Sequence, residues 1–242
     1  MLRLSGWVAL LIGSMLFAPQ LQAQGGEQLV AAMHSRYKDN WYRTLTFTQE
    51  TSFYRNDSLL RQSTWYERVR FPYELRIDVD SINGGNKTLY KKDSTYRIRR
   101  GKIASAAVDP NPFIFFLGGM YMLPLDTVKA TLKQNGYDLS RSALTDWKGR
   151  KTLVVGAGTS TDTTGNQFWV DAEHFYIVRI LLKSGGKLLD VRLSEHRKLP
   201  KGWSETRVDF YIDGKLLQTE KYRDLEIDEV IGDDVFDVRP FR

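Results

Sequence analysis

Side chains that commonly carry out catalysis are few in this sequence. The 242 residues include no Cys and three His. These are His34, His174 and His196, which lie far apart and outside any HExxH-type metal motif. No GxSxG elbow, P-loop or GxGxxG sequence before a predicted helix occurs. Asp and Glu are abundant, yet no pair stands out as the acid and base of a glycosidase. We therefore expect no catalytic residues, no metal site and no cofactor.

The most distinctive segment of the chain is apolar. Residues 113–117 read Phe-Ile-Phe-Phe-Leu and are flanked by Pro110, Pro112 and Pro124. On a short helix these five side chains point in all directions, so one face can pack on a sheet and the other needs a different cover. The segment is expected to plug one mouth of a barrel, to form a lid over a ligand cavity, or to do both. The lid candidates are Phe113, Phe116, Leu117 and Met120.

Alternation of apolar and polar residues dominates the chain after residue 44 and predicts β-strands. Turn sequences, such as Asn-Gly-Gly-Asn at 83–86 and Asp-Gly at 213–214, separate these stretches and indicate an antiparallel meander. Apolar residues recur at helical spacing over 27–37, and a short helix is expected over 126–134 with Asp126 as its N-cap. We expect a mainly β fold of about ten or eleven strands. The candidates for its inner face are Trp65, Val69, Phe71, Leu75, Ile77 and Val79.

The start of the chain has the layout of a secretory signal peptide. Arg3 precedes an apolar run at 6–17, and a short tail ends at Ala23. We predict a cleaved signal peptide over 1–23 and a single domain over 24–242. Export without Cys favours a bacterial periplasm. The net charge is +6, and a basic stretch at 87–102 is either a solvated strand face or a surface for anionic membrane or an acidic partner. No nucleic-acid-binding motif is found.

Several short motifs, in their order along the chain, resemble the periplasmic lipoprotein carrier family, the LolA-like proteins. Phe47-Thr48-Gln49 resembles the F-x-Q opening of that family, and Asn-Pro-Phe-Ile-Phe-Phe-Leu at 111–117 resembles its Pro-led lid. The remaining motifs are Thr-Trp-Tyr-Glu-Arg at 64–68 with Pro72 and Leu-Arg-Ile at 75–77, Phe-Trp-Val-Asp at 168–171 with Val-Arg-Ile at 178–180, and Asp-Asp-Val-Phe-Asp at 233–237.

The resemblance implies an unclosed antiparallel β-barrel with helices over its opening and an apolar interior that takes lipoprotein acyl chains. In the family, an Arg just before a Pro hydrogen-bonds the lid backbone and holds the empty cavity shut. Arg68 is the counterpart by motif, and Arg70 is a rival because it lies closer to Pro72. The resemblance also implies a monomer that meets an inner-membrane release complex and an outer-membrane acceptor.

These observations together favour a periplasmic carrier or chaperone that shields acyl chains or lipid and moves them toward the outer membrane without covalent chemistry. Two alternatives stay open, which are a sensor or scaffold module of the cell envelope on the same fold, and a cell-envelope hydrolase. The interior would distinguish them. A large apolar cavity favours the carrier, a filled interior the scaffold, and a polar cleft with paired carboxylates the enzyme.

Overall fold

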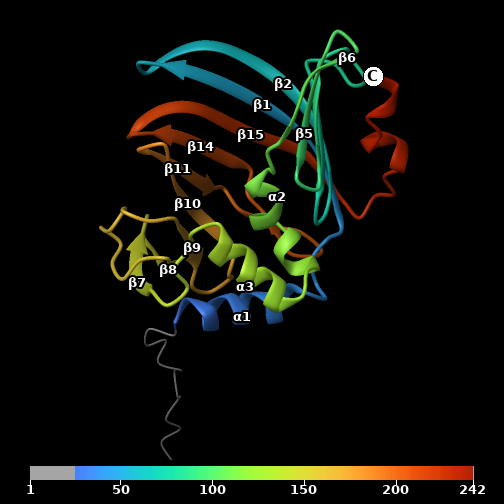
Figure 1. The fold of residues 1–242 in the computed structure, drawn as a ribbon. Helices are drawn as coiled ribbons and strands as arrows, with labels where there is room; N and C mark the ends of the chain where they lie inside the picture. The colour runs from blue at the N-terminus through green and yellow to red at the C-terminus, as the bar shows by residue number, and fades with distance from the viewer. Residues whose placement is uncertain (1–24, 242) are drawn as a thin grey trace, which may run out of the picture.

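The computed structural model describes residues 25–241, and the predicted signal peptide at 1–23 lies outside the described residues. Thirteen strands form one antiparallel sheet in the order β6-β5-β4-β3-β2-β1-β15-β14-β11-β10-β9-β8-β7. The end strands β6 and β7 do not pair, so the sheet curls around an interior without closing (Figure 1). The strands are β1 (Thr44–Arg55), β2 (Ser58–Arg70), β3 (Glu74–Val79), β4 (Lys87–Lys91), β5 (Ser94–Arg99), β6 (Lys102–Val108), β7 (Ser142–Trp147), β8 (Arg150–Val155), β9 (Gln167–Asp171), β10 (Ile177–Ser184), β11 (Lys187–Ser194), β14 (Arg207–Ile212) and β15 (Lys215–Ile227), with the separate pair β12 (Arg197–Lys198) and β13 (Trp203–Ser204).

The predicted fold class, a mainly β, unclosed antiparallel barrel with helices over the opening, is confirmed. The sheet holds thirteen strands rather than the expected ten or eleven. Short, weakly alternating strands account for the difference. Strand β6, for example, is exposed along most of its length and contains three small Ala side chains, so its sequence carries little apolar period.

Tight turns connect the long hairpins at the middle of the sheet. Between β1 and β2, Asn56 and Asp57 both adopt positive φ, which is the backbone of a two-residue hairpin turn. Between β14 and β15, Asp213 and Gly214 do the same, with φ of 49° and 79°. The predicted Asp-Gly turn is therefore present, and it sets Ile212 opposite Lys215.

Three helices cover the interior. Helix α1 (Gly26–Tyr37) and helix α3 (Leu125–Gln134) pack together at one end of the sheet, where Lys133 Nζ lies 2.6 Å from a Glu27 carboxylate oxygen. Helix α2 (Pro112–Phe116) lies on the concave side, followed by the short helix η1 (Gly119–Met122) (Figure 1). Helix α3 begins at Leu125 behind Pro124, so the expectation that Asp126 caps it was wrong. Asp126 instead occupies the first turn, where a carboxylate meets free backbone N–H groups.

The C-terminal segment lies on the outer face of the β2–β4 region (Figure 1). Its helix η2 (Asp233–Phe236) places Phe236, which is fully buried, beneath the Arg70 guanidinium at 4.8 Å from the ring centroid. The last helix, η3 (Arg239–Phe241), sets the Phe241 ring 4.8 Å from Lys87 Nζ. Within residues 25–241, no helix combines the length and apolar character needed to cross a membrane.

Candidate ligand-binding cavity

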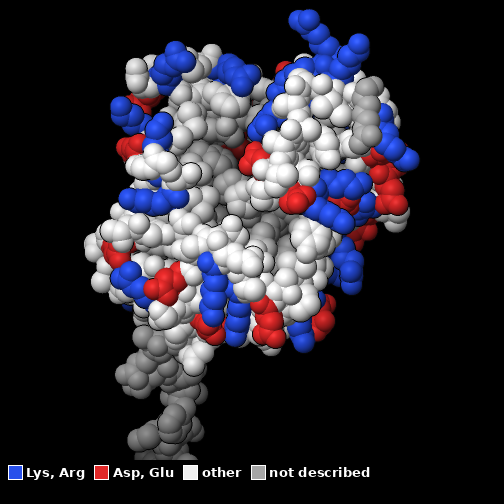
Figure 2. All heavy atoms as spheres, in the orientation of Figure 1, with Lys and Arg blue, Asp and Glu red and all other residues white. Residues whose placement is uncertain are grey.

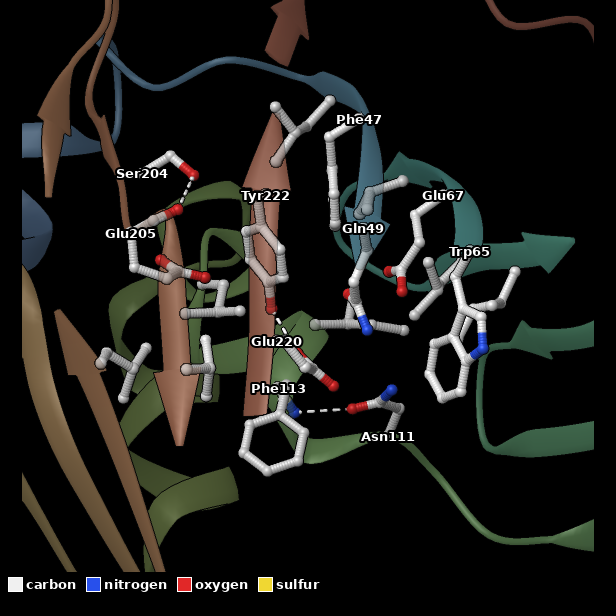
Figure 3. Close-up of a pocket in the computed structure, with 18 of the residues that line it drawn as sticks. Phe47, Gln49, Trp65, Glu67, Asn111, Phe113, Ser204, Glu205, Glu220 and Tyr222 are labelled. Atoms are coloured by element: carbon white, nitrogen blue, oxygen red, sulfur yellow. Dashed lines mark hydrogen bonds between the residues drawn. The ribbon is translucent and has the colours of Figure 1, made fainter. Parts of the chain in front are cut away.

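A cavity of about 270 Å³ lies between the concave face of the sheet and helix α2 (Figure 3). Its walls come from β1, β2 and β3 on one side, from β11, β14 and β15 on another, and from the α2 segment. Figure 2 shows a hollow in the middle of this face, walled mainly by uncharged side chains, with Lys and Arg around its edge. The apolar wall is made of Leu45, Phe47, Val69, Phe71, Leu75, Ile77, Ile114, Leu117, Val191, Leu193, Val208 and Phe210, with the rings of Trp65 and Phe113.

Most of the predicted inner-face residues lie at this cavity. Trp65, Val69, Phe71, Leu75 and Ile77 all line it. Val79 does not line it and packs against the core as a partly buried side chain. The arrangement follows from strand geometry, since alternate residues of β2 and β3 point to the same face of the sheet.

The predicted lid residues divide between cavity and core. Phe113 and Leu117 line the cavity, and the Phe113 ring meets Phe210 edge-on with centroids 5.7 Å apart. Phe116 points the other way and packs on Phe168 at 5.4 Å. Met120 is fully buried and belongs to the core. The lid therefore anchors one face in the core and offers the other to the cavity.

Helix α2 also separates the cavity from a second, larger hollow. This outer groove has a volume of about 920 Å³, and Asn111 and Ile114 line both spaces. The helix is held by its start, where the Asn111 side-chain oxygen accepts a 2.8 Å hydrogen bond from the Phe113 N–H and Pro112 takes the first helical position. A single five-residue helix is thus the partition between two hollows.

Three glutamates face the cavity from different elements. Glu67 comes from β2, Glu205 from the segment before β14, and Glu220 from β15 (Figure 3). Each is 7–8% exposed. The Tyr222 hydroxyl donates to one oxygen of Glu220 at 2.6 Å, and the Gln218 amide donates to the other at 2.6 Å.

Burial raises the pKa of all three carboxyls. The pKa of Glu205 is raised to about 8 and that of Glu220 to about 7, in both cases chiefly by burial. Burial, followed by the charges of Glu220 and Glu205, holds the pKa of Glu67 well above its ordinary value. No Lys, Arg or His lines the cavity, so the raised pKa values keep part of these carboxyls protonated, and uncharged, near neutral pH.

Neither a protein-family profile nor a curated protein sequence matches the chain. Solved structures do match it over 90% of its length. They include a DUF1329 family protein from Desulfovibrio piger, with a TM-score of 0.61, 14% identity and 98% of its own chain covered. A LolA superfamily protein from Nitrosomonas europaea matches with a TM-score of 0.57, 9% identity and 99% coverage.

A third structure, a domain from Vibrio parahaemolyticus described as an outer-membrane lipoprotein-sorting protein, matches with a TM-score of 0.56, 11% identity and 98% of its chain covered. The chain has the LolA-like fold. The likeness at these identities concerns the arrangement of the sheet and helices. The chemistry of the interior must therefore be read from this chain's own residues.

Arg68 and Arg70 do not hold the lid of this LolA-like fold, and that expectation was wrong. Glu67 and Val69 point into the cavity, so their neighbours on β2 point outward. Arg68 Nη1 donates to Asp78 at 3.2 Å, and Arg70 donates to Glu74 at 2.6 Å and to Asp233 at 2.7 Å. Both Arg therefore act on the outer face, and Arg70 fastens the C-terminal segment.

Sequence reasoning also missed the glutamates of the LolA-like interior. Glu67 shares the β2 face with Trp65 and Val69, so its position in the alternation was a usable signal. Glu220 shares a face with Tyr222 in the same way. Glu205 lies outside any strand, and no local pattern indicates its direction. Within residues 25–241, no group of three or more acidic or His side chains is arranged to hold a metal ion.

Proposed function

We propose that this protein is an exported periplasmic carrier that holds acyl chains of lipid or lipoprotein in the cavity and moves them toward the outer membrane. The observation that carries the proposal is the cavity itself, which is apolar, partly open and covered by a short helix. A scaffold protein would fill this space with its own side chains, because protein interiors are normally close-packed.

Burial of the cargo supplies the binding energy in this proposal. Each CH₂ group that leaves water contributes about 0.8 kcal/mol. A single acyl chain therefore gains enough to be held against the apolar part of the cavity wall. The outer groove offers further volume on the other side of α2. A cargo with two acyl chains would occupy both the inner cavity and the outer groove. The partners are then a membrane complex that releases the cargo and an acceptor that takes it.

Native mass spectrometry of the delipidated protein, after incubation with phospholipid or a diacylated peptide, tests the carrier function. We expect one lipid to bind per chain. Val69→Phe and Ile77→Phe, which fill the cavity from β2 and β3, should each weaken binding. Val230→Phe is the matched control, because Val230 is fully exposed. No bound lipid on the folded wild-type protein would end the proposal.

The cluster of carboxyls favours one second candidate, an acid–base hydrolase of the cell envelope. Glu205 and Glu220 have raised pKa values near neutrality, as a general acid requires. The lining carries polar groups, but most of its wall is apolar, and this argues against a sugar or peptide substrate. Turnover of an envelope ester or glycoside that is abolished by Glu220→Gln, with folding and lipid binding intact, would favour the hydrolase.

A further inference from the structure

The buried acidic side chains of this protein fall into two classes. Four buried aspartates each have an ion-pair partner among the described residues, as Asp78 has Arg76 at 2.8 Å and Asp190 has Arg179 at 2.8 Å. The other two, Asp171 and Asp209, pair with Arg150 and Arg207. The three buried glutamates at the cavity have no such partner in residues 25–241.

Among the three glutamates, Glu67 most clearly lacks a partner. It is 92% buried, its carboxyl points into the cavity (Figure 3), and within the described chain it receives no hydrogen bond and meets no cation. No side chain in that part of the molecule donates to the Glu205 carboxyl either. Glu205 receives only a backbone hydrogen bond from its own N–H, whereas side chains donate to Glu220, among them Tyr222 and Gln218. A buried carboxyl without a partner is costly, so a partner that arrives with the cargo would relieve this cost.

The cavity offers acceptors and no cation. An anionic headgroup entering it would find no Lys, Arg or His for pairing and would meet three acids instead. A cationic amine presents donors and a positive charge to those same oxygens, and hydrogen bonds to charged partners are the stronger kind. The remaining wall is apolar and suits a hydrocarbon tail.

We propose that the cavity selects amphiphiles that carry a cationic amine on an alkyl or acyl tail, and that Glu67, Glu205 and Glu220 are the groups that bind the amine. The inference rests on the proposed carrier function and names the class of its cargo. Binding leaves the ammonium intact, and a glutamic acid at the cavity gives its proton to solvent as it forms the ion pair. No covalent bond changes.

The other titratable groups that face the cavity do not compete for this role. Tyr42, Tyr90 and Tyr222 line it, and burial raises the pKa of each phenol, so all three stay neutral at physiological pH. The glutamates are therefore the cavity groups, among those described, that can change charge when an amine enters.

Isothermal titration calorimetry with dodecylammonium, dodecanol and dodecanoate, below their micelle concentrations, tests the proposal. The three probes share a tail and differ in the charge of the head. At about pH 7.5, we expect dodecylammonium to bind about tenfold or more tightly than dodecanol, with dodecanoate weakest. Titrations in buffers of different ionisation enthalpy should show net proton release with dodecylammonium only.

The triple variant Glu67→Gln, Glu205→Gln, Glu220→Gln should lose the preference and the proton release while still binding dodecanol. Glu50→Gln, on the exposed face of β1, is the matched control and should behave as the wild type. Equal affinities for the three probes in the wild-type protein, or no proton release, would overturn the inference and leave the carrier function standing. If none of the probes binds, both proposals fail.

Discussion

At the scale of single residues, the environment of a carboxyl decides its charge. Asp78 is fully buried on the outer face and has three cations around it, with Arg76 at 2.8 Å, Arg68 at 3.2 Å and Lys87 at 3.4 Å. Glu220 is also buried, but its partners are a phenol and an amide. An ion network on one face and neutral acids on the other are two solutions to the same desolvation cost.

The cavity acids should make stability fall as the pH rises. Each has an ordinary pKa of 4.5, and in the folded protein that of Glu220 is raised to about 7 and that of Glu205 to about 8. The folded state therefore binds more protons than the unfolded state between these values. The stabilising contribution is complete below pH 4.5 and is lost as the pH rises through 7 and 8. We expect the free energy of unfolding, measured by urea denaturation, to decrease from pH 6 to pH 9 by on the order of 1 kcal/mol per pH unit.

Glu220→Gln supplies the control for this pH dependence. The amide keeps the shape of the protonated acid and cannot ionise, so the variant should lose part of the decline between pH 6 and pH 9. Glu50→Gln, an exposed change on β1, should leave the wild-type profile unaltered. A midpoint that is flat over this range in the wild-type protein would contradict the pKa assignment.

The outer network around Asp78 should matter for folding rather than for cargo. In Asp78→Ala, the buried cations Arg76 and Lys87 would lose their common partner. We expect a loss of about 3–5 kcal/mol in the free energy of unfolding, measured by urea denaturation. The comparison is Asp146→Ala, which removes an exposed pair with Lys151 and should change stability little. A loss no larger than that of Asp146→Ala would show that the network is not stabilising.

At the scale of elements, alternation in sequence predicts which strand residues share a face of the sheet. It does not predict which charged residues lie on the face that lines the barrel interior. The pattern alone predicts that Trp65, Val69 and Phe71 face the interior, and they line the cavity. Glu67 obeys the same alternation, but acidic side chains are usually exposed, so its residue type argues against the interior position that it occupies. For Arg68, the expected contact with the lid is absent. Its partner is Asp78 on the neighbouring strand β3, and this pairing can be recognised only from the β2–β3 register.

The glycines after helix α2 illustrate a further limit of sequence reasoning. Gly118-Gly119 suggests a hinge, but a Cβ on Gly118 would lie 2.5 Å from Trp41 Nε1 and 2.8 Å from Phe71 Cζ. The segment is therefore packed closely against aromatic rings. Gly118→Ala should destabilise the fold by about 1–3 kcal/mol in urea denaturation. Gly158→Ala is the control, because its nearest neighbour would be an Arg141 nitrogen at 3.6 Å. Equal stability of the two variants would argue against close packing at Gly118.

At the scale of the whole molecule, the cavity is a product of topology. Strands β1 and β15 lie side by side at the centre of the sheet although they come from opposite ends of the described chain. They bring Phe47 and Tyr222 to ring centroids 4.5 Å apart and join the β1–β6 and β7–β14 halves into one wall. A local pattern could predict the strands and many inward residues. It could not predict that three glutamates distant in sequence line one cavity, because this depends on a pairing that spans the sequence.

If the protein carries lipid as proposed, the sizes of the two hollows on either side of α2 determine how a large cargo would fit. The inner cavity of about 270 Å³ is below the range of about 300–1,000 Å³ that is usual for ligand pockets, whereas the outer groove holds about 920 Å³. A two-chain lipid cannot occupy the inner cavity alone, so α2 must shift for the two spaces to join. The sheet need not change, since β1 and β15 are tied by a long antiparallel ladder with one register shift between Thr46 and Thr48.

Hydrogen–deuterium exchange with and without a bound two-chain lipid measures this movement. We expect faster exchange in the lipid-bound protein at the amide of Leu117, which bonds the Phe113 carbonyl at 2.9 Å in α2, because the short helix loses its packing as it moves. The amides of β1 and β15 should keep their protection and serve as internal controls. Dodecanol, which has a single shorter chain, should leave α2 exchange unchanged. Slower exchange at Leu117 with the two-chain lipid would mean that the cargo enters without moving the partition.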